Sequence, residues 1–240
     1  MGKEVNSRYE EYSPSITADG SHLYFTSRRS NTTGEQIDRK GDFKFYEDIY
    51  QSTRDSKGDW SEAEKVEGSV NTETHDGILS ILPDGSAMYV YKNDGKNAGD
   101  IWISQKEVNT GNFGVPTALN HPVNTEAFES STSITEDGKF LYFVSERPKG
   151  FGRGDIYFSE NNNGIWSAPK NLGDIVNTEG DEKFVFIHPS GKSLYFASNG
   201  HLSLGGYDVF KSEWVDGMWT PPINLGYPIN TVNEESTLSI

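Results

Sequence analysis

The 240-residue sequence contains no cysteine, which excludes disulfide bonds, thiolate metal sites and cysteine nucleophiles. It also lacks any run of about 18 apolar residues, so we expect no transmembrane helix. The first residues, Met-Gly-Lys-Glu, lack the apolar core of a signal peptide, so an exported protein would have lost its leader. The absence of cysteine is compatible with either side of a membrane.

Basic residues are scarce, with 21 Lys and Arg against 36 Asp and Glu and a formal net charge of −15. Because a nucleic-acid backbone is bound by clustered Lys and Arg, we expect no nucleic-acid partner. Reaction motifs are absent as well: there is no Gly-x-Ser-x-Gly elbow. No two of the five histidines have ligand spacing, which predicts no zinc site. We therefore predict no catalytic residues and no enzymatic activity.

Aromatic residues (12%) and glycine (25 residues) are abundant, a composition typical of an all-β protein with many tight turns. A Val/Ile-Asn-Thr/Ser motif recurs in steps of 65, 53, 53 and 53 residues. Its asparagines are Asn6, Asn71, Asn124, Asn177 and Asn230. A Gly-containing hairpin turn follows each of the first four asparagines at the same distance.

Further landmarks keep the same order in every repeat. In the third repeat the turn at Asp137-Gly138 precedes a Tyr strand, Leu141-Tyr142-Phe143. A Gly-rich loop then leads to an Asp-Ile strand, Asp155-Ile156-Tyr157, and Trp166 closes the repeat after another turn. The other repeats close with Trp60, Phe113 and Trp219. We expect these aromatics on outer strands, covering the seams between repeats.

Each repeat thus holds four strand-length segments and no apolar stripe of period 3.6. Four strands in a repeat of about 50 residues is the pattern of a β-propeller blade. We predict an all-β propeller of four complete four-stranded blades in a single domain, residues 1–240. The blades cover approximately 9–66, 74–119, 127–172 and 180–225. The tail 236–240 matches the first strand of a further blade, which indicates a fragment of a larger propeller or an unusual closure.

Between Asp137 and Glu182 the chain contains Asp-Gly, Leu-Tyr-Phe, Ser-x-Arg, Gly-x-Gly, Asp-Ile-Tyr, Gly-x-Trp and Asn-Leu-Gly, followed by the Asn-Thr motif and an acid. This pattern resembles the TolB-like, WD-repeat-like propeller repeats of Gram-negative envelope proteins, and the resemblance extends from Val5 to Ile240. Such repeats often accompany tetratricopeptide and OmpA-like peptidoglycan-binding domains. The resemblance implies a binding scaffold in the periplasm or at the outer membrane, with a protein partner or peptidoglycan-associated machinery.

An acid follows each repeat asparagine by five residues. These acids are Glu11, Asp76, Glu129, Glu182 and Glu235. In a propeller this point lies where one blade passes to the innermost strand of the next, so symmetry would gather the acids at one mouth of the channel. There they could bind a polar ligand or a hard cation such as Ca²⁺. The alternative is a structural latch, in which each acid pairs with a backbone N–H or an Arg. Repetition favours the latch, because active sites break symmetry.

The loops between the Tyr and Asp-Ile strands differ from repeat to repeat, and variable loops on a rigid scaffold commonly carry recognition. Their cations are either a basic patch for a partner or solvated loop charge. The candidate partner-binding residues are Arg28, Arg29, Arg39, Lys40, Arg147, Lys149, Phe151 and Arg153. Phe151 is the expected interface anchor, unless it folds back on its own loop.

Two functions remain open at this point. The first is a non-enzymatic scaffold that binds a protein or cell-wall partner at the bacterial envelope. The alternative is a glycan-binding or glycan-hydrolysing propeller that uses carboxylates at the channel mouth. Such an enzyme needs an acid and a nucleophile or base in different environments, about 5–9 Å apart. Because the five acids look equivalent in the sequence, the scaffold is favoured.

Overall fold

A computed structural model of the protein describes residues 2–39, 41–92 and 99–238. Over these residues the chain forms β-strands, and its one helix is the three-residue 3₁₀ turn η1 (Thr33–Glu35). Nothing in this part of the chain is a helix long and apolar enough to cross a bilayer. The prediction of an all-β chain is confirmed.

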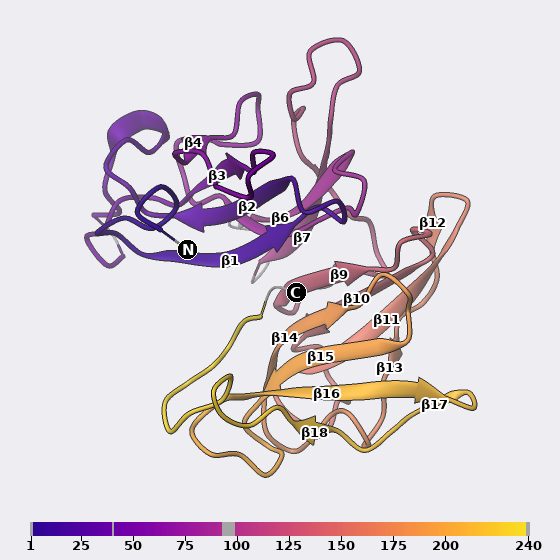
Figure 1. The fold of residues 1–240 in the computed structure, drawn as a ribbon. Coiled ribbons are helices and arrows are strands. Elements are labelled where there is room, and N and C mark those ends of the chain that lie inside the picture. Colours follow the sequence, from indigo (N-terminus) through magenta and orange to yellow (C-terminus); the bar gives the residue numbers. More distant parts are fainter. Residues whose placement is uncertain (1, 40, 93–98, 239–240) are drawn as a thin grey trace. The chain divides into compact units, whose positions relative to one another are not determined.

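The strands form four antiparallel sheets in which consecutive strands pair, and each sheet is one propeller blade (Figure 1). Blade 1 consists of β1 (Glu11–Ile16), β2 (His22–Ser27), β3 (Asp48–Thr53) and β4 (Glu64–Lys65). Blade 2 consists of β5 (Gly77–Ile81), β6 (Ala87–Lys92), β7 (Asp100–Gln105) and β8 (Thr117–Ala118). The predicted four-bladed β-propeller fold is therefore confirmed.

Blades 3 and 4 follow the same order but have a divided outer edge. Blade 3 consists of β9 (Glu129–Ile134), β10 (Phe140–Ser145), β11 (Asp155–Asn162), β12 (Ile165–Trp166) and β13 (Lys170–Asn171). Blade 4 consists of β14 (Glu182–Ile187), β15 (Ser193–Ser198), β16 (Asp208–Val215), β17 (Met218–Trp219) and β18 (Ile223–Asn224). The Trp strands β12 and β17 pair with the ends of β11 and β16, whereas β13 and β18 pair further back along them.

The expectation that each closing aromatic lies on the outer strand needs correction for the first two blades. Trp60 forms an isolated bridge to Arg54, Phe113 forms isolated bridges to Lys106 and Gly68, and the outer strands β4 and β8 come after them. The reason is that, within its own blade, the short hairpin carrying the aromatic pairs just past the end of the third strand. The rest of that strand is left to a separate two-residue segment.

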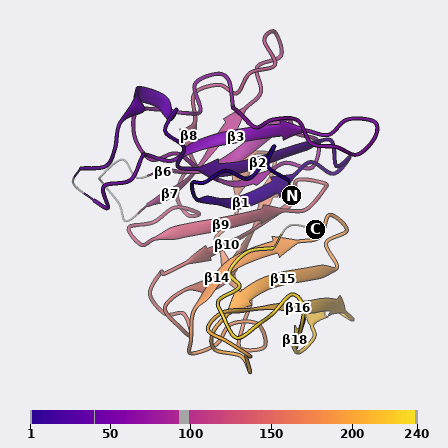
Figure 2. The ribbon, with the colours of Figure 1, turned by 60° about the vertical axis from the view of Figure 1, so that its left-hand side comes forward.

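The described chain divides into two compact units. The first contains β1–β6 and Trp102–Ala118, and the second contains Leu119–Ile240 with the start of β7. Within the second unit, Val185 N–H donates to Ser131 Oγ and Ile187 N–H to Ser133 Oγ, both at 3.0 Å. These bonds fix β14 against β9, the innermost strands of blades 4 and 3. Figures 1 and 2 show β14, β15 and β16 side by side in this unit.

In each unit an apolar cluster joins the two blades, and the first unit has a further cluster around Leu23, Phe25 and Tyr50 of blade 1. In the second unit Tyr142, Ile156, Val185, Phe196 and Trp219 belong to one buried cluster. Trp219 of blade 4 meets Tyr142 of blade 3 edge to face, with ring centres 6.3 Å apart. Phe113 of blade 2 meets Tyr24 of blade 1 in the same way. The expected seam-covering role is therefore seen for these two aromatics.

The C-terminal tail was predicted to supply the first strand of a further blade, over 236–240. Residues 236–238 have no strand pairing, and residues 239–240 lie outside the described residues. Glu235 N–H, just before them, donates to Tyr207 O at 2.8 Å. The tail is thus held next to blade 4 at the position where a repeat acid is expected.

Candidate functional site

Four repeat acids lie at or next to the start of an innermost strand, Glu235 lies in the C-terminal tail, and each acid closes a turn with the Ser or Thr four residues earlier. At Glu129 the Thr125 N–H donates to Oε2 at 3.0 Å and the Thr125 hydroxyl to Oε1 at 2.6 Å. The same pair of bonds recurs at Ser7–Glu11, Thr72–Asp76, Thr178–Glu182 and Thr231–Glu235. We call this arrangement the latch.

A second group from the adjacent strand completes most latches. The Ser145 hydroxyl donates to Glu129 at 2.8 Å, and Ser198 does the same for Glu182 at 2.7 Å. In blade 2 the equivalent residue is Lys92, whose ammonium pairs directly with Asp76. The contacts are those of the structural alternative. Binding of a ligand by these five acids stays a prediction.

Arginine side chains form ion pairs with the acids of two latches. Arg147 Nη2 lies 3.4 Å from Glu129 Oε1 and donates to Val123 O at 2.7 Å, while its guanidinium lies over the rings of Phe143 and Tyr157. Arg29 makes the equivalent contacts with Glu11, with Val5 O and with the rings of Phe25 and Tyr50. Both arginines were predicted to belong to a basic loop patch, and this is corrected: their charge is used inside the blade.

The latch of blade 4 has no arginine. Gly200 occupies the equivalent position, and a Cβ there would lie 1.8 Å from the Thr178 hydroxyl. His201 takes over part of the arginine's role: its Nε2 lies 2.8 Å from Val176 O, and its ring packs on Phe196 and Phe210. No ion pair with Lys or Arg is made by Glu182 within the described ranges. Burial, with a smaller contribution from the charge of Asp155, raises the pKa of Glu182 to about 7.

The repeat asparagines have a role that the sequence interpretation missed. The Asn177 side chain accepts from Ile156 N–H at 2.8 Å and donates to Ile156 O at 2.9 Å and to Asn171 Oδ1 at 2.8 Å. Asn124 and Asn230 clamp the first residues of the neighbouring Asp-Ile strands similarly. A side-chain amide supplies two donors and an acceptor at the same time, as these three bonds require, and the recurrence of Asn in every repeat was the signal.

We expect Asn177→Ala to lower the free energy of unfolding by about 2 kcal/mol, because it leaves the Ile156 N–H buried without its acceptor and removes one of the two hydrogen bonds to Ile156 O. Chemical unfolding monitored by tryptophan fluorescence measures this change. The matched control is Asn162→Ala, at an exposed position at the end of β11, which should change stability by less than about 0.5 kcal/mol. Equal losses in the two variants would contradict the clamp.

The loop of blade 3 is pinned by the strand that follows it. Asp155 accepts from Phe151 N–H at 2.6 Å and from Gly152 N–H at 3.0 Å. The Phe151 side chain is nevertheless 48% exposed. Arg153, which is 74% exposed, pairs with Glu146 at 3.2 Å. A fixed backbone therefore presents an exposed aromatic next to an exposed cation.

The remaining loop cations differ in exposure. Arg28 is buried: it donates to Phe45 O at 2.7 Å and makes two bonds to the Asp42 carboxylate. The prediction that Arg28 belongs to an exposed basic patch is therefore corrected. Arg39 and Lys149 are exposed. Lys40 lies outside the described residues.

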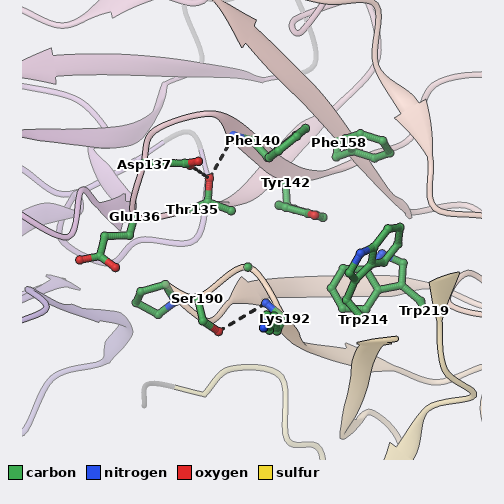
Figure 3. Close-up of a pocket in the computed structure, with 12 residues that line it drawn as sticks. Thr135, Glu136, Asp137, Phe140, Tyr142, Phe158, Ser190, Lys192, Trp214 and Trp219 are labelled. Atoms are coloured by element: carbon green, nitrogen blue, oxygen red, sulfur yellow. Dashed lines mark hydrogen bonds between the residues drawn. The ribbon is translucent and has the colours of Figure 1, made fainter. Parts of the chain in front are cut away.

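A pocket that the sequence interpretation missed opens between the outer parts of blades 3 and 4 (Figure 3). Its volume is about 770 Å³. Five aromatic rings line it, from Phe140, Tyr142, Phe158, Trp214 and Trp219. The Thr135–Asp137 segment and the hairpin turn of blade 4, ending at Lys192, form the polar side.

No set of three or more His, Asp or Glu side chains is placed to share a metal ion in the parts of the chain that the structure describes. Ca²⁺ binding by the repeat acids therefore stays a prediction.

Comparison with known proteins places the fold. Neither a protein-family model nor a curated protein matches the sequence. Several solved structures, however, align with the structure of this chain. TolB from Acinetobacter baumannii aligns over 95% of this chain and 47% of its own, with a TM-score of 0.59 and 16% identity. A putative TolB from Agrobacterium tumefaciens aligns over 92% and 63%, with a TM-score of 0.55 and 18% identity.

An enzyme has the same fold. An α-L-arabinofuranosidase from Podospora anserina, solved with cellotriose, aligns over 92% of this chain and 69% of its own, with a TM-score of 0.51 and 14% identity. At these identities the likeness establishes a TolB-type β-propeller fold and no more. The chain spans about half the length of the Acinetobacter protein.

Proposed function

We propose that the chain is a non-enzymatic β-propeller scaffold that binds a protein or cell-wall partner at the bacterial envelope. The observation that carries this proposal is the burial and hydrogen bonding of the repeat acids. Glu129 and Glu182 are almost fully buried, and their oxygens accept hydrogen bonds from Thr125 and Thr178. An acid in a glycan-hydrolysing site must reach its substrate. The side chains that are left for a partner belong to the individual loops.

The resemblance to TolB-like repeats also supports a proposal for the cellular location. TolB-like repeats of this pattern are those of Gram-negative envelope proteins, and the solved structures of TolB share the fold. We therefore place the scaffold in the periplasm or at the outer membrane, with a protein or peptidoglycan-associated partner. Because the repeats supply the frame, specificity comes from the loops that differ between blades.

Phe151 and Arg153 are the residues that we expect to anchor the partner. Exposed aromatic and Arg side chains at an interface commonly cost about 2 kcal/mol or more when truncated. The double variant Phe151→Ala/Arg153→Ala should therefore bind the partner roughly thirtyfold more weakly, with an unchanged melting temperature. The partner is isolated from an envelope extract with the immobilised wild-type chain, and its affinity for both forms is then measured.

The control for this experiment is Val108→Ala, which truncates a fully exposed side chain of another blade and should leave binding unchanged. Unchanged binding by the double variant, or a lower melting temperature with binding intact, would mean that the loop only packs. The glycan alternative is tested with an oligosaccharide hydrolysis screen. Turnover that is abolished by Glu129→Gln or Glu182→Gln would establish that alternative instead.

A further inference from the structure

The aromatic pocket of the second unit has a counterpart in the first unit at equivalent positions of the repeat. Trp214 pairs with Trp219 across the hairpin that ends blade 4. Lys106 pairs with Phe113 across the corresponding hairpin of blade 2. In both, the first residue donates its N–H, at 2.8 Å, to the residue that follows the Gly turn of its own blade. Lys106 is therefore the equivalent of Trp214, and Phe113 of Trp219.

In the first unit this place is occupied by a cation of the chain itself. The Lys106 Nζ lies 3.5 Å from the Tyr24 hydroxyl and 5.2 Å from the centre of the Phe113 ring. Those two rings meet edge to face at 5.8 Å. An ammonium at this distance is attracted by the negative face of the ring. The first unit thus shows which chemical group this arrangement of two rings holds.

The second unit keeps the rings and lacks the cation. Tyr142 and Trp219 meet edge to face at 6.3 Å, and the lysine is replaced by Trp214, whose ring centre lies 5.1 Å from that of Trp219. Over the residues that the structure describes, no Lys or Arg lies over Tyr142 or Trp219. Lys139 lies over Phe140 and Lys170 over Phe158, two other rings of the pocket.

Charge and size indicate what the second unit could hold. Glu136 and Asp137 line the pocket against a single cation, Lys192, in a chain with a formal net charge of −15. The pocket is about 770 Å³, whereas the pocket that Lys106 and Phe113 help to line in the first unit is about 340 Å³. Pockets of about 300–1,000 Å³ hold small ligands or a short stretch of a peptide. At the adjacent hairpin, Met218 is exposed and extends the apolar surface.

We propose that this pocket binds a Lys or Arg side chain from a basic segment of a partner polypeptide, held over the Trp219 ring and beside the Tyr142 hydroxyl, as the Lys106 ammonium is held over Phe113 and beside the Tyr24 hydroxyl. The proposal rests on the proposed scaffold function and names a site and a ligand class for it. The flanking part of the segment packs on Trp214. Figure 3 shows the space proposed for this segment, between Tyr142, the two tryptophans and Lys192.

The test is a titration of the ¹⁵N-labelled chain with two blocked tetrapeptides, Ala-Lys-Lys-Ala and its norleucine counterpart. The chain has five tryptophans, so the indole N–H signals of Trp214 and Trp219 can be assigned by single Phe substitutions. We expect saturable shifts of these two signals with the lysine peptide. The norleucine peptide, which has the same shape without the charge, should bind about tenfold more weakly.

The most informative variant replaces Trp214 by lysine, the residue at the equivalent position of blade 2. Trp214→Lys places an internal ammonium where Lys106 lies in the first unit, and it should weaken binding of the lysine peptide about tenfold. The matched control is Val108→Lys, which adds the same charge at a fully exposed position and should leave binding unchanged. Both variants should keep the melting temperature of the wild type.

Several results would overturn the proposal. They are equal binding of the two peptides, no shift with either peptide, shifts produced by cellotriose alone, and wild-type binding by Trp214→Lys. The scaffold function is judged separately, by the dependence of the extracted partner on Phe151 and Arg153. A partner that binds through that loop, with no response at the pocket, removes the pocket proposal and leaves the scaffold in place.

Discussion

Replacement of Glu129 by glutamine is expected to lower the free energy of unfolding by about 3 kcal/mol at pH 7. Glu129 is fully buried, and its carboxylate faces the Arg147 guanidinium at 3.4 Å. Glutamine keeps the shape but removes the negative charge, which leaves a largely buried cation without its counter-ion. Its NH₂ group also replaces an oxygen that now accepts from hydroxyl groups. Urea unfolding measures the loss.

A second ion pair of the same blade provides the control. Lys139 and Glu160 are also 3.4 Å apart, but both side chains are more than one-third exposed. Exposed pairs contribute about 0.2–1 kcal/mol, so Glu160→Gln should cost less than about 1 kcal/mol. The two pairs have the same separation and differ in burial. If the two variants lost the same stability, the buried latch would have no special role in blade 3.

The fold could be predicted because the residues that recur are those with main-chain partners. A propeller repeats the same hydrogen-bonding problem in every blade, so the same amide and the same acid recur at fixed spacing. Asn177 and Glu182 show this: one clamps Ile156 and the other accepts from Thr178. The interpretation of the acids as latches used this logic, and their contacts agree with it.

The inward position of Arg147 could not be predicted from its own surroundings. It follows a strand and precedes a Gly-rich loop, which is the pattern of an exposed cation. Its location depends on Phe143 and Tyr157, which come from two different strands and form a stacked pair only in the folded blade. A signal did exist, because Arg29 occupies the same position of the repeat. The symmetry argument applied to the acids also holds for these arginines.

The aromatic pocket escaped the sequence interpretation for the opposite reason. It arises where the repeat is broken, at Trp214, a position filled by Lys106 in blade 2. A single substitution of this kind carries no periodic signal. Only the pairing of the hairpin residues shows that the two side chains occupy equivalent places.

Blade 4 breaks the repeat in a second way, and this leads to a prediction about pH. Glu182 has the hydroxyl partners of its latch, Thr178 and Ser198, but no arginine. Its pKa is raised to about 7 from an ordinary value of 4.5, first by burial and then by the charge of Asp155. Between these values the folded state holds a proton that the unfolded state has released. Stability must therefore fall as the pH rises through this range.

The free energy of unfolding should fall by about 3 kcal/mol, since each tenfold change in proton affinity corresponds to 1.36 kcal/mol. The groups whose pKa values are lowered, such as Asp19 and Asp137, lose their contribution only below their ordinary value of 3.8. Burial also raises the pKa of Asp48, so the contribution of Glu182 is taken from the difference between the wild type and Glu182→Gln. The stability of the wild type relative to Glu182→Gln should therefore decrease across this range, because glutamine cannot titrate.

Urea unfolding at several pH values between about 5 and 8 measures this difference. Above pH 7 Glu182→Gln should be more stable than the wild type, whereas Glu129→Gln should be less stable. The same substitution thus has opposite signs in two latches, because only one of them contains an arginine. His201→Gln is the second control, since His201 also lies in blade 4, where its Nε2 contacts Val176 O. A pH dependence that survives Glu182→Gln but disappears with His201→Gln would assign the effect to the histidine and refute the role of Glu182.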